Sequence, residues 1–153
     1  AAGSFPRLID LGVDEKVISS AVSVALAQRL VRKLCQACKI KRAPTQEEKA
    51  LIDKHLATVT DKTLLPTDTS SVWDAKEGGC PECGARGYKG RIGIFEVFPI
   101  SDAISKMILS RAPMKDIENQ AINEGMIAMK QDGYLKALEG ITTLEEVLRV
   151  AQD

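Results

Sequence analysis

The four cysteines of the sequence form two C-x-x-C pairs that lie far apart along the chain. Two thiolates separated by two residues can bind one metal ion from a tight turn, and two such turns complete a tetrahedral set of sulfurs that suits Zn²⁺. The second pair makes the better turn, because Pro81 restricts the backbone and Gly84 tolerates a left-handed conformation after the last sulfur. We therefore predict one structural zinc ion per chain. Its ligands would be Cys35, Cys38, Cys80 and Cys83.

Other uses of four cysteines need to be weighed against a zinc site. Two disulfides are disfavoured, because we find no signal peptide and 153 residues are enough to bury a core without cross-links. A thioredoxin-like redox pair should begin a helix after a strand, whereas Cys80 follows Gly78 and Gly79 in a loop. An iron–sulfur cluster would use the same sulfurs, and the sequence leaves it open. His55, the one histidine, is expected to be solvated on a helix and is not counted as a ligand.

Charge is balanced over the whole chain but uneven along it. The formal net charge is +0, which argues against bulk attraction to nucleic acid or to an acidic membrane surface. No apolar stretch approaches the roughly 18 to 20 residues of a membrane span, so we expect at most peripheral attachment to a membrane. The metal end should nevertheless be basic. Its cations are Arg29, Arg32, Lys33, Lys39, Lys41 and Arg42 around the first pair, and Arg86, Lys89 and Arg91 after the second.

The elements that must position these residues are mostly helical. Capping signals and glycine stops define most helices, and a β-branched and aromatic run ending at Pro99 indicates a strand. The segment 26–34 alternates in a way that fits neither a strand nor a helix cleanly, and 58–79 reads as an irregular excursion. The fold class is therefore mixed α/β and helix-rich. The expected helices cover 4–11, 15–23, 49–57, 102–110, 113–124, 126–138 and 147–151, and the expected strand covers 91–98.

One carboxylate lies in an unfavourable place. Glu96 is on the expected strand, whose apolar residues occur on both faces, so the strand should be central and the carboxylate poorly solvated. A buried charge is rarely left unpaired. We therefore expect a structural ion pair between Glu96 and Arg29 or Arg32.

The residues provide no catalytic constellation. The basic, glycine-rich turn at 87–93 has neither Gly-Lys-Ser/Thr nor a following helix, so it is read as a turn beside a zinc knuckle rather than a phosphate loop. No general acid, base and nucleophile come together in any known pattern.

Three segments together resemble the C-terminal part of the motor ATPases of type II secretion and type IV pilus assembly. The segments are 27–35, 80–97 and 125–150, and they occur in the family's order over nearly the whole chain. The resemblance implies a C-terminal fragment of a RecA-like ATPase domain with an inserted four-cysteine zinc-binding subdomain, and it makes 26–34 a strand beside 91–98. The implied domains are 1–34 (end of the ATPase core), 35–84 (zinc subdomain), 85–100 (core strand) and 101–153 (helical subdomain).

The resemblance also implies a function and partners. The parent would be a homo-hexameric, Mg²⁺-dependent ATPase, cytoplasmic and peripheral to the inner membrane, that couples ATP hydrolysis to pilus or pseudopilus assembly. Its phosphate loop, Walker B acid and histidine box would precede Ala1, so ATP and Mg²⁺ belong to the parent only and the chain alone should not be catalytic. Partners would be the N-terminal remainder of the ATPase and the inner-membrane assembly platform proteins. The segment 89–96 leans slightly toward the pilus branch.

An alternative belongs to a different class of protein. A stand-alone zinc-ribbon adaptor could bind nucleic acid or a protein through the basic end. Few aromatic residues for base stacking, zero net charge and long helices argue against nucleic acid binding.

Overall fold

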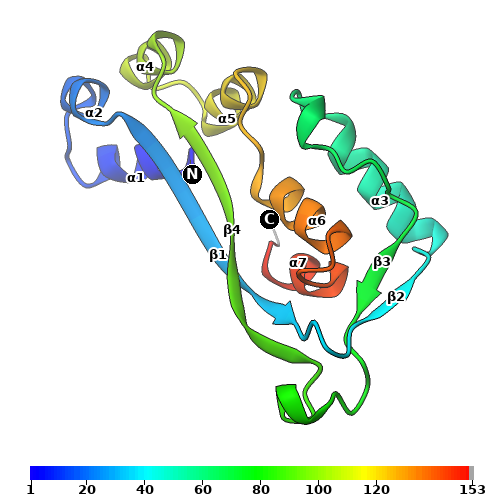
Figure 1. The fold of residues 1–153 in the computed structure, drawn as a ribbon. Helices are drawn as coiled ribbons and strands as arrows, with labels where there is room; N and C mark the ends of the chain where they lie inside the picture. Colours follow the sequence, from blue (N-terminus) through cyan, green and yellow to red (C-terminus); the bar gives the residue numbers. More distant parts are fainter. Residues whose placement is uncertain (152–153) are drawn as a thin grey trace. The chain divides into compact units, whose positions relative to one another are not determined.

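The computed structural model describes residues 1–151, which divide by their internal contacts into two compact units. Unit 1 contains Ala1–Ala27 and Glu96–Ala128, and unit 2 contains Gln28–Phe95 and the chain from Met129 onward. Two long strands, β1 (Val24–Leu34) and β4 (Tyr88–Pro99), pair with each other and contribute to both units (Figure 1). With seven α-helices in the described residues, the mixed, helix-rich α/β class is confirmed.

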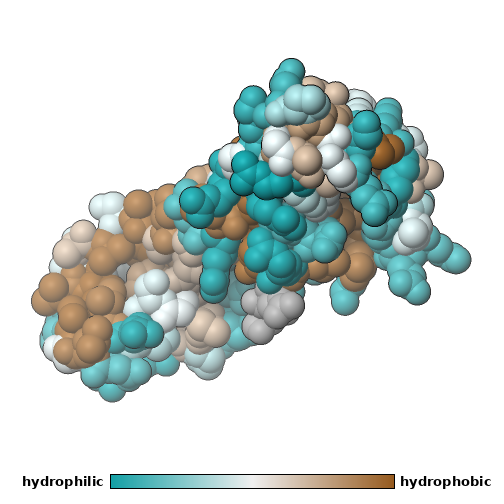
Figure 2. All heavy atoms as spheres, turned by 90° about the horizontal axis from the view of Figure 1, so that it is seen from below, coloured by the Kyte–Doolittle hydropathy of each residue, from teal (hydrophilic) through white to brown (hydrophobic). Residues whose placement is uncertain are grey.

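Unit 1 is built from four helices and one end of the two strands. The helices pack around a core that includes Phe5, Ile18, Phe98, Ile104 and Ile117. Exposed apolar side chains remain outside this core, and the hydrophobic surface at the left of Figure 2 lies where α1 and α2 are drawn. The helices are α1 (Ser4–Asp10), α2 (Glu15–Ala21), α4 (Asp102–Leu109) and α5 (Met114–Asn123).

Unit 2 carries both cysteine pairs. A short antiparallel ribbon pairs β2 (Ile40–Arg42) with β3 (Val72–Asp74), so that Lys41 lies opposite Trp73. Ile52, Val72 and Tyr134 belong to its larger core cluster, and a smaller cluster contains Val31, Ile94 and Ala151. The remaining elements are α3 (Gln46–Ala57), the 3₁₀ turns η1 (Lys62–Leu64) and η2 (Pro81–Cys83), α6 (Met129–Leu138) and α7 (Leu144–Val150).

The helix starts expected at 4, 15, 102 and 113 agree with the structure to within one residue, whereas α3 and α7 begin three residues before the expected 49 and 147. The helix expected from 126 begins at Met129, because the N–H of Met126 bonds to the carbonyl of Ala121 and so closes the end of α5. The excursion 58–79, expected to be irregular, contains β3. Within residues 1–151, β1 is the one strand that pairs with β4, so β4 is not the central strand that its apolar residues indicated. None of the helices in this range is both long and apolar enough to cross a bilayer.

Candidate metal centre

The two cysteine pairs meet in unit 2. All four sulfurs lie within 4.8 Å of one another, and all four cysteines are free of disulfides. The sulfur of Cys80 is 3.7 Å from that of Cys35 and 3.8 Å from that of Cys83, which is in turn 3.9 Å from the sulfur of Cys38. A tetrahedron with zinc–sulfur bonds of about 2.3 Å has sulfurs about 3.8 Å apart. The donor set therefore suits Zn²⁺ in both chemistry and spacing.

The second pair forms a preorganised turn. Pro81 begins η2, and Gly84 ends it in a left-handed conformation with φ +59°, as the sequence predicted. The sulfur of Cys83 accepts hydrogen bonds from the backbone N–H of Cys80 and of Gly87, each at 3.2 Å. These N–H groups, that of Cys80 first, lower the pKa of the Cys83 thiol to about 6 despite its burial. The lowered pKa of Cys83 makes its thiol readily converted to the thiolate that a metal requires.

In the first pair, Cys38 is less favourable to negative charge. Burial, and then hydrogen bonds among the neighbouring thiols, raise the pKa of Cys38 to about 12. The opposite shifts of Cys38 and Cys83 mean that the cluster resists carrying four negative charges by itself. A divalent cation would remove that penalty by displacing the thiol protons, so metal binding should be strongly pH-dependent.

Hydrogen bonds tie the first turn to the second and to the rest of the unit. The N–H of Cys35 donates to the carbonyl of Gly87 at 3.0 Å. Lys39 donates to the carbonyl of Gly140 at 2.9 Å while its ammonium lies 4.2 Å from the centre of the Trp73 ring. Gly140 has φ +70°, and a Cβ there would come within 2.8 Å of Trp73. The loop between α6 and α7 is thus fitted closely against the metal turns.

Arg32 has a partner in unit 2 that the sequence did not predict. Arg32 donates to Glu146 through its side chain at 2.7 Å and through its backbone N–H at 2.9 Å. Arg149 donates to the same carboxylate at 2.8 and 3.0 Å. Glu146 is fully buried, so it requires these donors more than a partly exposed acid would.

Glu146 was not among the residues expected in a site, because its spacing of three residues from Thr143 is that of a capping box, which already gives the glutamate a role. Thr143 does accept the N–H of Glu146, as a helix cap should, but the glutamate side chain turns to the arginines instead of back to the cap. The sequence did hold one indication of an ion pair, because Arg149 lies one helical turn after Glu146. Glu96 belongs to unit 1, where its carboxylate lies against the amino group of Ala1. Its pairing with Arg29 or Arg32, both exposed residues of unit 2, stays a prediction.

Two more residues of unit 2, His55 and Trp73, make aromatic contacts. His55 stacks on Tyr134 with ring centres 5.0 Å apart, and the four-sulfur group contains no histidine among the described residues. Trp73, in β3, is half-buried, and its ring lies against the ammonium group of Lys39. The structure therefore brings together the four predicted ligands and provides them with neighbours that the sequence did not reveal.

Comparison with known proteins gives matches along nearly all of the chain. The family model described as "Type II/IV secretion system protein" matches residues 1–149. The type IV pilus assembly ATPase PilB of Myxococcus xanthus is 36% identical over 97% of this chain, and PilB of Pseudomonas aeruginosa is 38% identical over 100% of it. Type II secretion system protein E of P. aeruginosa is 36% identical, also over 100%. The chain spans only 25%, 25% and 28% of the lengths of these relatives, respectively.

Proposed function

Because the chain belongs to the type II/IV secretion system protein family, we propose that it is the zinc-binding and helical region of a motor ATPase for type IV pilus assembly or type II secretion. The observation that carries the proposal is the four-sulfur group, in a chain whose whole length matches a part of such proteins. The pilus relative is 38% identical and the secretion relative 36%, so the proposal includes both branches.

In this proposal the chain provides structure and coupling rather than catalysis. The parent is a hexameric, RecA-like ATPase at the cytoplasmic side of the inner membrane, and its ATP and Mg²⁺ are bound by other parts of the protein. Residues 1–34 and 85–100 complete its core, 35–84 form the zinc subdomain and 101–153 the helical subdomain. The zinc subdomain transmits the motion of the hexamer to the platform proteins of the assembly machinery.

Zinc bound by Cys35, Cys38, Cys80 and Cys83 would act as a structural cross-link. Four thiolates leave no open position for substrate or water, which is typical of structural sites. The ion would join the end of β1 to the beginning of β4, since Cys35 follows β1 directly and Cys83 lies five residues before β4 begins. The chain's own N–H groups prepare this site before metal arrives, through the bonds to the sulfur of Cys83.

The proposal is tested in the parent protein. The double substitution Cys80→Ser and Cys83→Ser should abolish pilus assembly or secretion in cells that depend on the parent, and the purified variant should contain no zinc. Ala37→Ser is the matched control, because it changes an exposed residue of the same turn and leaves all four sulfurs in place. Normal assembly or secretion by the double variant would refute the coupling role. A stand-alone adaptor, the alternative class, would instead work without any ATPase segment attached.

A further inference from the structure

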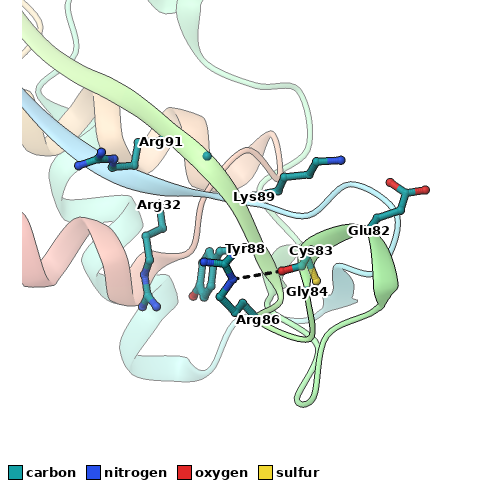
Figure 3. A pocket seen from close by; sticks show the side chains of 9 residues that line it. Arg32, Glu82, Cys83, Gly84, Arg86, Tyr88, Lys89 and Arg91 are labelled. Carbon is teal, nitrogen blue, oxygen red and sulfur yellow. Dashed lines mark hydrogen bonds between the residues drawn. The ribbon is translucent and has the colours of Figure 1, made fainter.

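A basic cavity lies beside the cysteine turns in unit 2. It has a volume of about 670 Å³ and is formed by the second cysteine turn, the beginning of β4 and one side chain from β1 (Figure 3). Four of its side chains are cationic and one is anionic. The lining residues are Arg32, Glu82, Cys83, Gly84, Arg86, Tyr88, Lys89, Gly90 and Arg91.

Two of the four cations are already engaged by the protein. Arg86 donates from Nε to the carbonyl of Cys83 at 3.3 Å, so it is part of the second cysteine turn. Its positive charge would offset the negative charge of thiolates there. Arg32 is bound to Glu146, and its guanidinium lies 4.1 Å from the centre of the Tyr88 ring. These contacts account for Arg86 and Arg32 without any ligand.

The other two cations have no such explanation. Lys89 and Arg91 are exposed residues of β4, and in the part of the chain that the structure describes neither side chain makes a hydrogen bond or an ion pair. They flank Gly90, which has φ +78° and open space where a Cβ would be. Two uncompensated charges thus stand beside a half-buried tyrosine on the wall of a cavity.

The arrangement of these groups favours a protein ligand over a single phosphate. Lys89 and Arg91 extend to opposite sides of β4 in Figure 3, whereas a phosphate site has donors that converge, usually backbone N–H groups of a helix N-terminus or a nest. Separated cations suit a chain with several carboxylates. Tyrosine and arginine are also among the residues most enriched at the energetic centres of protein interfaces.

We propose that this cavity binds an acidic, extended segment of a partner protein. Carboxylates of the segment pair with Arg91 and Lys89, and its backbone or an apolar side chain packs against Tyr88. The inference deepens the proposed function, because it names the chemistry of the assembly partner that this region contacts. Binding itself requires neither ATP hydrolysis nor the parent, so it is measured on the chain alone.

The probe is a short fluorescein-labelled peptide of alternating glutamate and serine, with a glutamine-for-glutamate peptide as the neutral control. Its anisotropy is titrated with the zinc-loaded chain. Arg91→Gln and Lys89→Gln should each weaken binding about two- to fivefold, the effect typical of an exposed ion pair. Lys54→Gln is the matched control, because it removes the same charge from an exposed position of α3 that does not line the cavity. Zinc content and circular dichroism should be the same in all variants.

Backbone amide chemical shifts locate the peptide independently. The changes should concentrate at 82–91 and Arg32, and should be weak at the other basic segment, 39–42. Shift changes spread over every basic surface, or equal weakening by Lys54→Gln, would overturn the proposal as non-specific attraction. Displacement of the peptide by tripolyphosphate at equimolar concentration would overturn it in favour of a phosphate site. None of these outcomes bears on the cysteine test in the parent, so the two proposals fail separately.

Discussion

Replacing Glu146 by glutamine should lower the stability of unit 2 in a pH-dependent way. The carboxylate is fully buried and receives four hydrogen bonds, two from Arg32 and two from Arg149. Burial acts to raise the pKa of Glu146, but the hydrogen bonds of Arg149 and Arg32 outweigh it and lower the pKa from 4.5 to about 2. The folded state therefore favours the ionised carboxylate.

The magnitude follows from this pKa difference. Lowering a pKa from 4.5 to about 2 stabilises the folded state by roughly 3 kcal/mol when the group is ionised in both states. The side chains of Arg32 and Arg149 are 48% and 55% exposed, so water can solvate them once the charge is removed. We therefore expect Glu146→Gln to cost about 2 kcal/mol, less than the roughly 3 to 5 kcal/mol of breaking a pair buried on both sides.

The sign of the pH effect is fixed by the lowered pKa. The stabilisation is complete above about pH 4.5 and disappears as the pH falls through about 2. Urea unfolding followed by circular dichroism at pH 7 and at pH 3 measures it, with zinc-free protein at both values because acid also protonates the thiolates. The difference between wild type and variant should shrink markedly at pH 3. An unchanged difference, or an equal loss in the exposed neighbour variant Glu145→Gln, would refute the reasoning.

The remaining predictions concern the metal and the absence of catalysis. Elemental analysis with thiol titration should find one Zn²⁺ per chain, and a metal-free protein with two disulfides would contradict the site. Cys80→Ser should lose the metal and increase hydrogen exchange across 43–79, while α4 and α5 stay protected because their apolar contacts lie in unit 1. The chain alone should release no phosphate from ATP with Mg²⁺. Activity that persists through further purification and scales with chain concentration would overturn that expectation.

The predictions made from sequence succeeded where a few neighbouring residues decide the structure. Thr45 and Ser101 accept backbone N–H groups at the starts of α3 and α4, as their spacing indicated. Pro81 and Gly84 shape the second cysteine turn locally as well. The proline ring restricts the backbone at the start of the turn, and glycine tolerates the positive φ at its end. The pairing of β1 with β4, by contrast, came from a family resemblance, because the alternation in 26–34 was ambiguous.

The sequence by itself identified the four cysteines as one candidate metal-binding group, because two C-x-x-C turns leave few uses for four thiols. The tertiary structure decided which charges meet. Arg32 and Glu146 are separated by 114 residues, and only the fold brings α7 against β1 to make that carboxylate buried and paired. Likewise β2 can pair with β3 only because α3 and the segment after it bring the chain back beside β2. Local hydrogen bonds depend on a few neighbouring residues and can be predicted from them. The burial of a side chain depends on every element that covers it, so it requires the whole fold.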